Sequence, residues 1–281
     1  MKKIIWVTVL TLMLSLILTG CGHSHDWAKE NCFSPKTCTV CGKIKGTPID
    51  HDWQDATCSE PKTCLLCGMH DGMALGHNIP TNSDTNKTCA TCGVLLKKTF
   101  SGNGSYNIGE IKIGEGFYKI YYNTEKKFGS AISVYSIFKG ISSITGELFT
   151  YKSLVKEINA DPQNEGYYCL QTAGIYSVLI GNLTGRWTIT IEKAEETTDT
   201  QFEGAGVYMT DVFNASSGQW KVTHDGKGEF EVVLYTSGGE QQILKQTGTV
   251  DETVSVVLPT DGQAVLGILA DGNWTITPVD P

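Results

Sequence analysis

The chain lacks several features that would place it in a common functional class. It has no run of basic residues of the kind that neutralises phosphate backbones, so we do not expect nucleic-acid binding. After the N-terminal segment it has no apolar stretch of membrane-spanning length. It contains no Gly-x-Ser-x-Gly elbow, His-Glu-x-x-His, phosphate-binding loop or dinucleotide fingerprint, and residues 99–281 contain a single His, His224. We therefore expect a protein that is not an enzyme.

The N-terminus has the pattern of an export signal. A basic start at Lys2 and Lys3 precedes residues 4–18, a mostly apolar, uncharged stretch that is short for a membrane-spanning helix. It ends in Leu18-Thr19-Gly20-Cys21, which resembles the bacterial lipobox. The resemblance implies a signal peptide of residues 1–20, and a Cys21 that carries a diacylglycerol and often a third acyl chain such as palmitate. Two buried chains anchor a protein stably, so we expect a lipoprotein on the extracytoplasmic face of the cell membrane.

The mature chain expected from this cleavage is acidic. Of 22 Lys plus Arg and 30 Asp plus Glu in the whole chain, only Lys2 and Lys3 are lost, which leaves 20 against 30 and a net charge of −10. Residues 22–98 hold 8 Lys and 8 acids, so the excess of acid falls in residues 99–281. The remaining 261 residues suffice for two or three small domains.

Residues 21–98 contain a Cys/His unit that recurs about three times with a period of 26 residues. The complete copies are His25, Cys32, Cys38, Cys41 and His51, Cys58, Cys64, Cys67, and a shortened copy has His77, Cys89 and Cys92. A fixed period of this kind indicates stacked copies of one small unit. Each complete unit ends in Cys-x2-Cys-Gly, the knuckle of zinc ribbons, whose spacing lets two thiolates meet one ion.

The units resemble the Cys/His/Trp repeats of surface proteins and lipoproteins of Gram-positive anaerobes, over residues 23–93. That resemblance concerns organisation and implies no activity. A structural zinc site needs four ligands, and each complete unit offers three Cys and one His. We therefore expect structural zinc in this array.

Two registers of ligands are open. If the His opens each site, the sites are His25, Cys32, Cys38, Cys41, then His51, Cys58, Cys64, Cys67, then His77, Asp84, Cys89, Cys92, with the Asp84 carboxylate replacing a missing Cys. If the His closes each site, the sites are Cys32, Cys38, Cys41, His51 and Cys58, Cys64, Cys67, His77, which leaves His25, Cys89 and Cys92 over. We favour the first register because it uses every Cys of the array and the His of each unit.

A disulfide framework is the alternative to metal, because disulfides normally form outside the cytoplasm. However, the three Cys of a complete unit cannot all pair within it, and pairing across units would break the equivalence of the repeats. Units of 26 residues cannot bury enough apolar surface to fold alone, so metal-binding energy would become folding energy. The array would then be a metal-stapled spacer or, alternatively, a device for zinc capture or buffering.

Residues 99–281 have the pattern of an all-β sandwich repeated in tandem. Short apolar or alternating runs recur between turn signals such as Asn103-Gly104 and Asp271-Gly272. The segment 100–106 matches 202–208 at an offset of 102, and 185–190 matches 272–277 at an offset of 87. We predict a mainly β fold with sandwiches at 99–195 and 201–281, joined by a polar linker. The first copy carries extra residues, among which 154–158 are predicted to form a short helix.

Aromatic residues in these copies have two interpretations. Because Trp187, Trp220 and Trp274 stand in the strand pattern, and two of them at equivalent places, we expect core anchors rather than sugar-stacking rings. An external strip of Tyr118, Tyr121 and Tyr122 is a weaker alternative. Cys169 stands in an apolar run and is expected to be a buried thiol, and His224 is expected in a turn.

The function expected from these features is that of a cell-surface lipoprotein. A zinc-stapled spacer would present tandem β-sandwich modules that bind an extracellular glycan or protein. The alternative is a lipoprotein that captures or buffers zinc through its Cys/His array.

Overall fold

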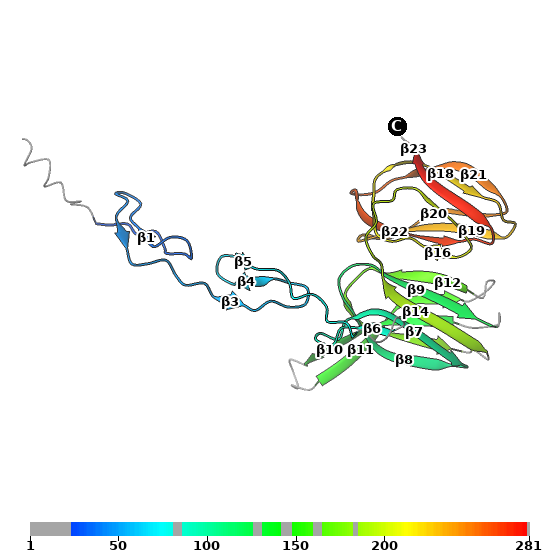
Figure 1. Cartoon of the computed structure of the whole chain (residues 1–281), viewed down its shortest axis with the longest axis horizontal. Helices are drawn as coiled ribbons and strands as arrows, with labels where there is room; N and C mark the ends of the chain where they lie inside the picture. Colours follow the sequence, from blue (N-terminus) through cyan, green and yellow to red (C-terminus); the bar gives the residue numbers. More distant parts are fainter. Residues whose placement is uncertain are drawn as a thin grey trace, which may run out of the picture. The chain divides into compact units, whose positions relative to one another are not determined.

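The fold is seen in a computed structural model that describes residues 24–80, 86–125, 131–141, 148–159, 165–181 and 185–279. The described residues form strands and turns without a helix, which confirms the expected mainly β class. None of them forms a helix long and apolar enough to cross a membrane. The chain divides into two compact units, Met1–His77 and Asn78–Pro281 (Figure 1). The lipobox with Cys21 and the segment with Asp84 lie outside the described residues.

The first unit consists of very short strands. The strands β1 (Lys36–Thr37) and β2 (Ile44–Lys45) pair as one hairpin. A three-stranded sheet has the order β3 (Trp53–Gln54), β4 (Lys62–Cys64) and β5 (His70–Asp71). Of residues 24–77, only Cys38, Cys58 and Cys64 are buried. This unit therefore has no apolar core of the ordinary kind.

The second unit begins with strand β6 (Asn86–Thr88) and continues into a two-sheet sandwich. One sheet has the order β12 (Glu165–Leu170), β9 (Tyr118–Thr124), β14 (Arg186–Lys193), β7 (Leu95–Asn103), β6. The other has the order β11 (Leu148–Asn159), β10 (Ala131–Ile141), β13 (Gly174–Gly181), β8 (Tyr106–Ile113). Their facing side chains, including Ile120, Val134 and Ile189, form one buried core. Because β6 pairs with β7, the third repeat joins the sheet of the first sandwich.

A second sandwich has the same topology. One sheet has the order β15 (Phe202–Ala205), β23 (Asn273–Val279), β18 (Gly218–His224), β21 (Val250–Val256). The other has the order β16 (Tyr208–Met209), β22 (Gly262–Leu269), β19 (Glu229–Thr236), β20 (Gly239–Thr247), with β17 (Phe213–Ala215) also on β22. When the strands of each copy are counted in chain order, the same strands pair with each other in both copies, as the internal repeat predicts.

The Trp residues anchor the two cores, as expected. Trp187, Trp220 and Trp274 are 1–3% exposed. The Trp187 Nε1 donates to the carbonyl of Gly104 over 2.9 Å, and the Trp274 Nε1 donates to the carbonyl of Gly206 over 3.2 Å. An indole buried in a core usually finds such an acceptor. These rings are thus not available to stack on a sugar.

Three other expectations for this region are corrected. The predicted short helix at 154–158 is wrong, because these residues belong to β11, which pairs along β10 from Ala131 to Ile141. Five residues make too few helical hydrogen bonds to compete with such a ladder. Tyr118 and Tyr122 are buried, so an external Tyr strip is excluded. His224 ends strand β18 and is 3% exposed, rather than standing in a turn.

The two sandwiches share a third apolar cluster. It comprises Phe117, Cys169 and Ala194 with Met209, Val212, Val233, Tyr235 and Val265. Cys169 is 1% exposed, which confirms the expected buried thiol, and burial raises the pKa of that thiol. The linker after Ala194 is fixed as well, since Val212 N donates to the Glu195 carbonyl over 2.7 Å. The pair therefore packs as one body within the second unit.

Candidate metal centres

Each Cys-x2-Cys segment forms the same knuckle. In the second copy, the Gly68 N–H donates to the Cys64 carbonyl over 2.9 Å, and the Cys64 N–H donates to the Met69 carbonyl over 2.8 Å. The knuckles that start at Cys38 and Cys89 have the equivalent bonds at 2.8–2.9 Å. Gly68 has a φ of 72°, a left-handed conformation that suits glycine, which explains the Gly after each knuckle. The turn directs both cysteine side chains toward one point.

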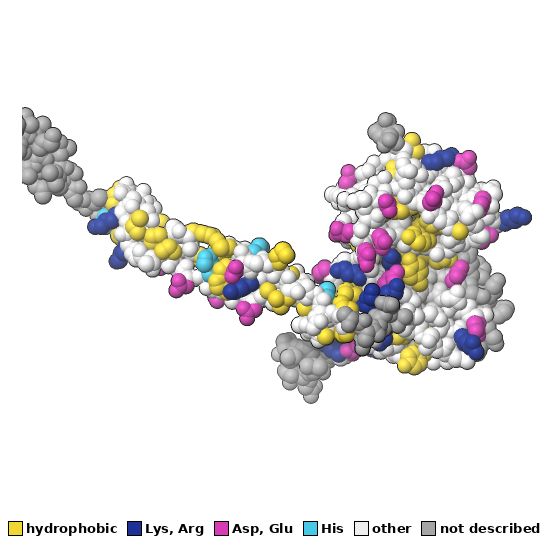
Figure 2. Space-filling view, viewed as in Figure 1, with side chains coloured by type: hydrophobic (Ala, Val, Ile, Leu, Met, Phe, Trp, Pro, Cys, Tyr) yellow, Lys and Arg dark blue, Asp and Glu magenta, His cyan; other side chains and the backbone are white. Residues whose placement is uncertain are grey.

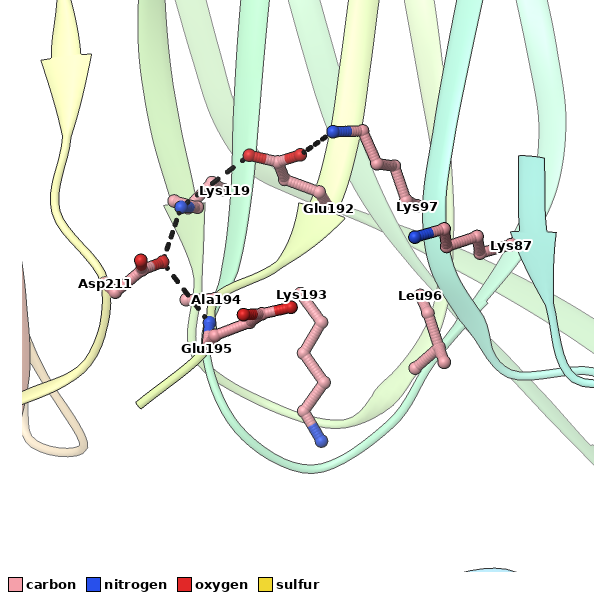
Figure 3. Close-up of a pocket in the computed structure, with 9 residues that line it drawn as sticks. All are labelled: Lys87, Leu96, Lys97, Lys119, Glu192, Lys193, Ala194, Glu195 and Asp211. Carbon is pink, nitrogen blue, oxygen red and sulfur yellow. Dashed lines mark hydrogen bonds and ion pairs between the residues drawn. The ribbon is translucent and has the colours of Figure 1, made fainter. Parts of the chain in front are cut away.

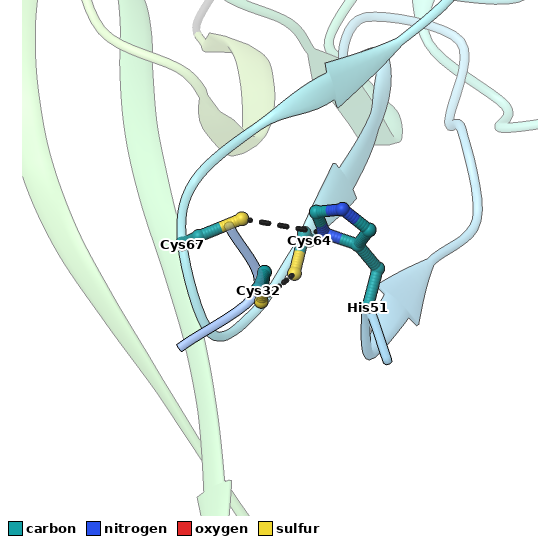
Figure 4. Close-up of side chains that lie close together, drawn as sticks. All are labelled: Cys32, His51, Cys64 and Cys67. Carbon is teal, nitrogen blue, oxygen red and sulfur yellow. Dashed lines mark hydrogen bonds between the residues drawn. The ribbon is translucent and has the colours of Figure 1, made fainter. Parts of the chain in front are cut away.

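Four side chains meet in the middle of the first unit (Figure 4). They are Cys32, His51, Cys64 and Cys67, and their ligand atoms all lie within 4.8 Å of one another. The Sγ atoms of Cys32 and Cys64 are 3.8 Å apart. The Cys67 Sγ lies 3.4 Å from the His51 Nδ1.

These distances fit the edges of a tetrahedron around one ion. With Zn–S bonds of about 2.3 Å and Zn–N bonds of about 2.0–2.1 Å, a tetrahedral site needs S···S edges of about 3.8 Å and S···N edges of about 3.6 Å. A disulfide would need about 2.05 Å between sulfurs, far less than the 3.8 Å between Cys32 and Cys64. The group could therefore hold a tetrahedral metal ion such as zinc without rearrangement.

Side chains around His51 hold its ring. The Trp53 ring lies 4.9 Å from the His51 ring, and the edge of Phe33 lies 6.1 Å from it, centroid to centroid. The Lys62 ammonium lies over the Trp53 ring, 5.1 Å from its centroid. The Leu65 N–H donates to the Asp52 carbonyl over 2.8 Å, which ties the knuckle to the His segment. Packing against aromatic rings fixes a ligand before an ion arrives.

The thiols of the middle group differ in acidity. Burial raises the pKa of the Cys64 thiol, but hydrogen bonds from His51 and from the N–H groups of Leu66 and Cys67 outweigh it and lower the pKa to about 6. Burial, and then contact with Cys67 and Cys64, raise the pKa of the Cys32 thiol to about 11. Three neighbouring thiolates repel one another, and a divalent cation supplies the charge that lets all three ionise.

A second group lies at the start of the unit. It contains His25, Cys38 and Cys41, whose ligand atoms also lie within 4.8 Å of one another. The His25 Nδ1 lies 3.5 Å from the Cys41 Sγ. The Trp27 ring lies 5.0 Å from the His25 ring, which repeats the arrangement of Trp53 and His51.

The structure joins the ligands in neither of the two expected registers. The middle group takes His51, Cys64 and Cys67 from one repeat, as the favoured register expects, but its fourth member is Cys32 of the preceding repeat and not Cys58. Cys32 is correspondingly absent from the group of His25, Cys38 and Cys41. The physical reason is that the knuckle and the His form one hairpin, whereas the first Cys of each repeat lies in a connecting loop that reaches forward. Sequence spacing alone does not show this direction.

The last ligand residues fall on both sides of the unit boundary. Cys58 is buried in the first unit, which ends at His77. Cys89 is buried in the second unit, where its knuckle leads into β7 and the Lys112 ammonium donates to the Cys92 carbonyl over 2.8 Å. Nine cysteines lie in described residues, and none of them forms a disulfide.

A groove in the second unit is a separate candidate for ligand binding (Figure 3). It has a volume of about 620 Å³ and is lined by Lys87, Leu96, Lys97, Lys119, Glu192, Lys193, Ala194, Glu195 and Asp211. The Lys119 ammonium lies 2.8 Å from Asp211 and 3.6 Å from Glu192, so it bridges the two sandwiches. The sequence contained one signal for this site, a Lys within the apolar run 117–122.

Comparison with known proteins provides no further assignment. No protein-family model matches the sequence, and no curated protein matches it closely enough to count as a relative. The geometry of the Cys/His groups therefore carries the functional argument.

Proposed function

We propose that this chain is a lipid-anchored surface protein in which zinc folds a Cys/His spacer that precedes a pair of ligand-binding β-sandwiches. One observation carries the proposal. The three buried residues among 24–77 are all cysteines, whereas each sandwich has a continuous apolar core. Something other than apolar burial must stabilise the first unit, and structural zinc contributes folding energy directly.

The exposed apolar side chains of the first unit support this reasoning. Leu65, Leu66 and Met73 are 63%, 57% and 86% exposed, and Figure 2 shows hydrophobic side chains on the surface of this part of the chain. They contribute little burial energy. The middle group meanwhile offers three sulfurs and one ring nitrogen at tetrahedral distances. This donor set suits zinc, whereas calcium and magnesium prefer oxygen ligands.

The repeat extends the same connectivity by one step along the sequence. Moving each ligand of the middle group forward by about one period leads to Cys58, His77, Cys89 and Cys92. These four residues are thus the sequence equivalents of the middle group in the next repeat.

The sandwiches are the proposed binding part. They pack against each other through an apolar cluster, and the groove at their junction is lined by Lys87, Lys97, Lys119 and Lys193 together with three acids. Charged side chains of both signs suit a polar extracellular ligand, such as a glycan that carries carboxylates or a protein surface. The lipobox-like segment and Cys21 supply the anchor in this proposal.

The test is metal removal followed by limited proteolysis. The chain, purified without oxygen, is treated with a strong chelator and a reductant, then with a protease. We expect rapid cleavage within residues 24–77 only after chelation, while the sandwiches stay intact. Equal resistance with and without metal would contradict the zinc-folded spacer.

The anchor is tested independently by Cys21→Ser. This variant should lose the incorporation of labelled palmitate and leave the membrane fraction, and its zinc content should stay unchanged. Retention of the label would contradict lipidation at Cys21.

A further inference from the structure

A row of charged side chains crosses four strands of the first sandwich. Glu192 on β14 pairs in register with Lys119 on β9 and with Lys97 on β7, and Lys97 pairs in turn with Lys87 on β6. Ion pairs join Glu192 to Lys97 and to Lys119 along this row (Figure 3). Three ammonium groups thus stand with one carboxylate over roughly 14 Å, at the usual spacing of strands. Since like charges directly opposite destabilise a sheet, the pairing of Lys87 with Lys97 costs stability and points to a use for the charge.

Hydroxyl and amide side chains cover the same face beside the charged row. Every second residue of a strand faces the same side, so Thr188 and Thr190 share the outer face with Glu192, while the residues between them point into the core. The strands on either side of β14 add the registered neighbours of these two threonines, which are Thr99, Ser101, Tyr121 and Asn123. Apart from Thr190 and Tyr121, these side chains are exposed. The face therefore offers hydroxyl and amide groups next to ammonium groups.

The second sandwich bounds this face on one side. The Tyr121 hydroxyl donates to the Met209 carbonyl over 3.3 Å and accepts from the Met209 N–H over 3.2 Å. The Asp211 carboxylate lies 2.8 Å from the Lys119 ammonium at the end of the charged row (Figure 3). These contacts give the face a fixed wall.

Two adjoining hollows result from this arrangement. The groove of about 620 Å³ lies along the charged row, and a second hollow of about 190 Å³ is lined by residues that include Thr188, Thr190 and Val207. Glu192 and Thr190, which are consecutive outward positions of β14, line the first hollow and the second one respectively. A linear ligand can therefore contact ammonium groups in one hollow and hydroxyl groups in the other.

We propose that this face binds an anionic polysaccharide, whose acid groups pair with Lys87 and Lys97 and whose hydroxyl groups hydrogen-bond to Thr188 and its neighbours. The inference rests on the proposed role of the sandwiches as the binding part, and it names the class of ligand. The charge complementarity is local. The groove is lined by four lysines and three acids, whereas residues 99–281 hold 12 Lys plus Arg and 22 acids, a net charge of −10. Such a body repels polyanions, so their binding requires a local site.

The composition of the face favours a sugar chain over a protein partner. The buried core of a protein interface is apolar and enriched in aromatic residues that act as anchors. The outward rows described above contain one aromatic ring, that of Tyr121, and its hydroxyl is already bonded to Met209. Their other side chains are Lys, Glu, Thr, Ser and Asn. This face supplies charge and hydrogen bonds without an apolar anchor.

The experiment measures the binding of polygalacturonate to the full chain, purified without oxygen and with its metal, by calorimetry at low salt. We expect saturable binding that weakens as the salt concentration rises. Fully methyl-esterified polygalacturonan has the same sugar backbone without the charge and should not bind. Polyglutamate has the charge without sugar hydroxyl groups and should bind at least about 5-fold more weakly.

Variants on the surface of the sandwiches assign the binding to this face. Lys87→Ala should weaken the binding of polygalacturonate at least about 5-fold, and Thr188→Val at least about 2-fold, as expected for a charged and a neutral hydrogen bond. Lys87→Arg keeps the charge and should bind within about 2-fold of the wild type. The matched control is Lys221→Ala, which removes the same charge from β18 of the second sandwich and should bind as the wild type does.

The outcomes separate this inference from the proposed function, because zinc content and protease resistance are measured on the same samples. Chain without zinc contradicts the zinc-folded spacer. Chain that holds its zinc but does not bind polygalacturonate overturns the polysaccharide site alone. Polyglutamate that binds as tightly as polygalacturonate would indicate an acidic protein segment as the ligand and would overturn the inference. Equal losses in Lys87→Ala and Lys221→Ala would show attraction without a site, and would overturn it as well.

Discussion

Cys32 and Cys64 belong to consecutive repeats, and their Sγ atoms lie 3.8 Å apart. One repeat thus completes the candidate metal group of the next, so these two repeats interlock and do not merely follow one another. This arrangement explains why the groups cannot be assigned to single repeats, whether the His is taken as the first or the last ligand of each site. It also means that loss of one ion should loosen two repeats.

The interlocked connectivity predicts which ligands share an ion. In protein loaded with ¹¹³Cd, the β-protons of Cys32, Cys64 and Cys67 should show scalar coupling to one cadmium resonance. Those of Cys38 and Cys41 should couple to a different one. Coupling of Cys32 to the cadmium of Cys38 would instead support a site closed within one repeat.

The direction of this connection could not be predicted from the sequence. The spacing of Cys38 and Cys41 predicts that they share an ion, because a knuckle brings both sulfurs together whatever surrounds it. The position of Cys32 in a loop does not predict which group it joins, since a loop of that length can reach the knuckle of its own repeat or that of the next repeat. Asp84 was expected as a ligand because it lies seven residues after His77, as Cys32 lies seven residues after His25, and it falls outside the described residues.

The tandem sandwiches were predictable for the opposite reason. Trp187 and Trp274, with the glycines that face them, recur at fixed offsets, and the topology of both copies follows the repeat. The exception was 154–158, where a few apolar residues between polar ones have no period long enough to distinguish a helix from an edge strand.

Close packing on the Trp rings predicts the effect of Gly204→Ala. A Cβ at Gly204 would lie 2.6 Å from the Trp274 Cζ2, so the ring or the strand must shift. We expect a loss of about 1–3 kcal/mol in the free energy of unfolding, as for an overpacked core. Denaturant unfolding followed by Trp fluorescence measures it.

The matched control is Gly218→Ala, where an added Cβ meets nothing within 4 Å. Its stability should stay within about 0.5 kcal/mol of the wild type. Equal effects of both substitutions would show that the Trp274 contact is not the cause.

Lys119 should stabilise the junction between the sandwiches. It is 8% exposed and bridges Glu192 and Asp211, so Lys119→Ala leaves Asp211 without its cation near an apolar junction, while Glu192 keeps its ion pair with Lys97. We expect a loss of about 1–3 kcal/mol and faster hydrogen exchange at Met209 and Val212. The control is Lys221→Ala, which removes a solvent-exposed ion pair with Asp251 and should cost at most about 1 kcal/mol. Unchanged exchange in Lys119→Ala would contradict this role.

The Asp271 carboxylate should make the second sandwich sensitive to acid. The N–H groups of Gly228 and Lys227 donate to it over 2.7 and 3.1 Å and hold its pKa below the usual range. A pKa that is lower in the folded state stabilises the fold fully above the unfolded value of about 3.9, and this stabilisation is lost as the pH falls through the folded pKa.

Asp271→Ala should therefore lower the melting temperature at pH 7, and the difference from the wild type should shrink as the pH falls below about 4. Calorimetry across that range measures it. Asp199→Ala, in the exposed linker, should follow the wild type at every pH. A constant offset between Asp271→Ala and the wild type at all pH values would count against an electrostatic role.

Metal, rather than disulfides or an apolar core, is proposed to hold the Cys/His array together. The most direct measurement is elemental analysis combined with thiol counting, on protein purified without oxygen, before and after denaturation with a chelator. We predict two to three zinc ions per chain, with the array thiols masked until the metal is removed. A chain without metal, whose array cysteines are oxidised in pairs, would contradict the account.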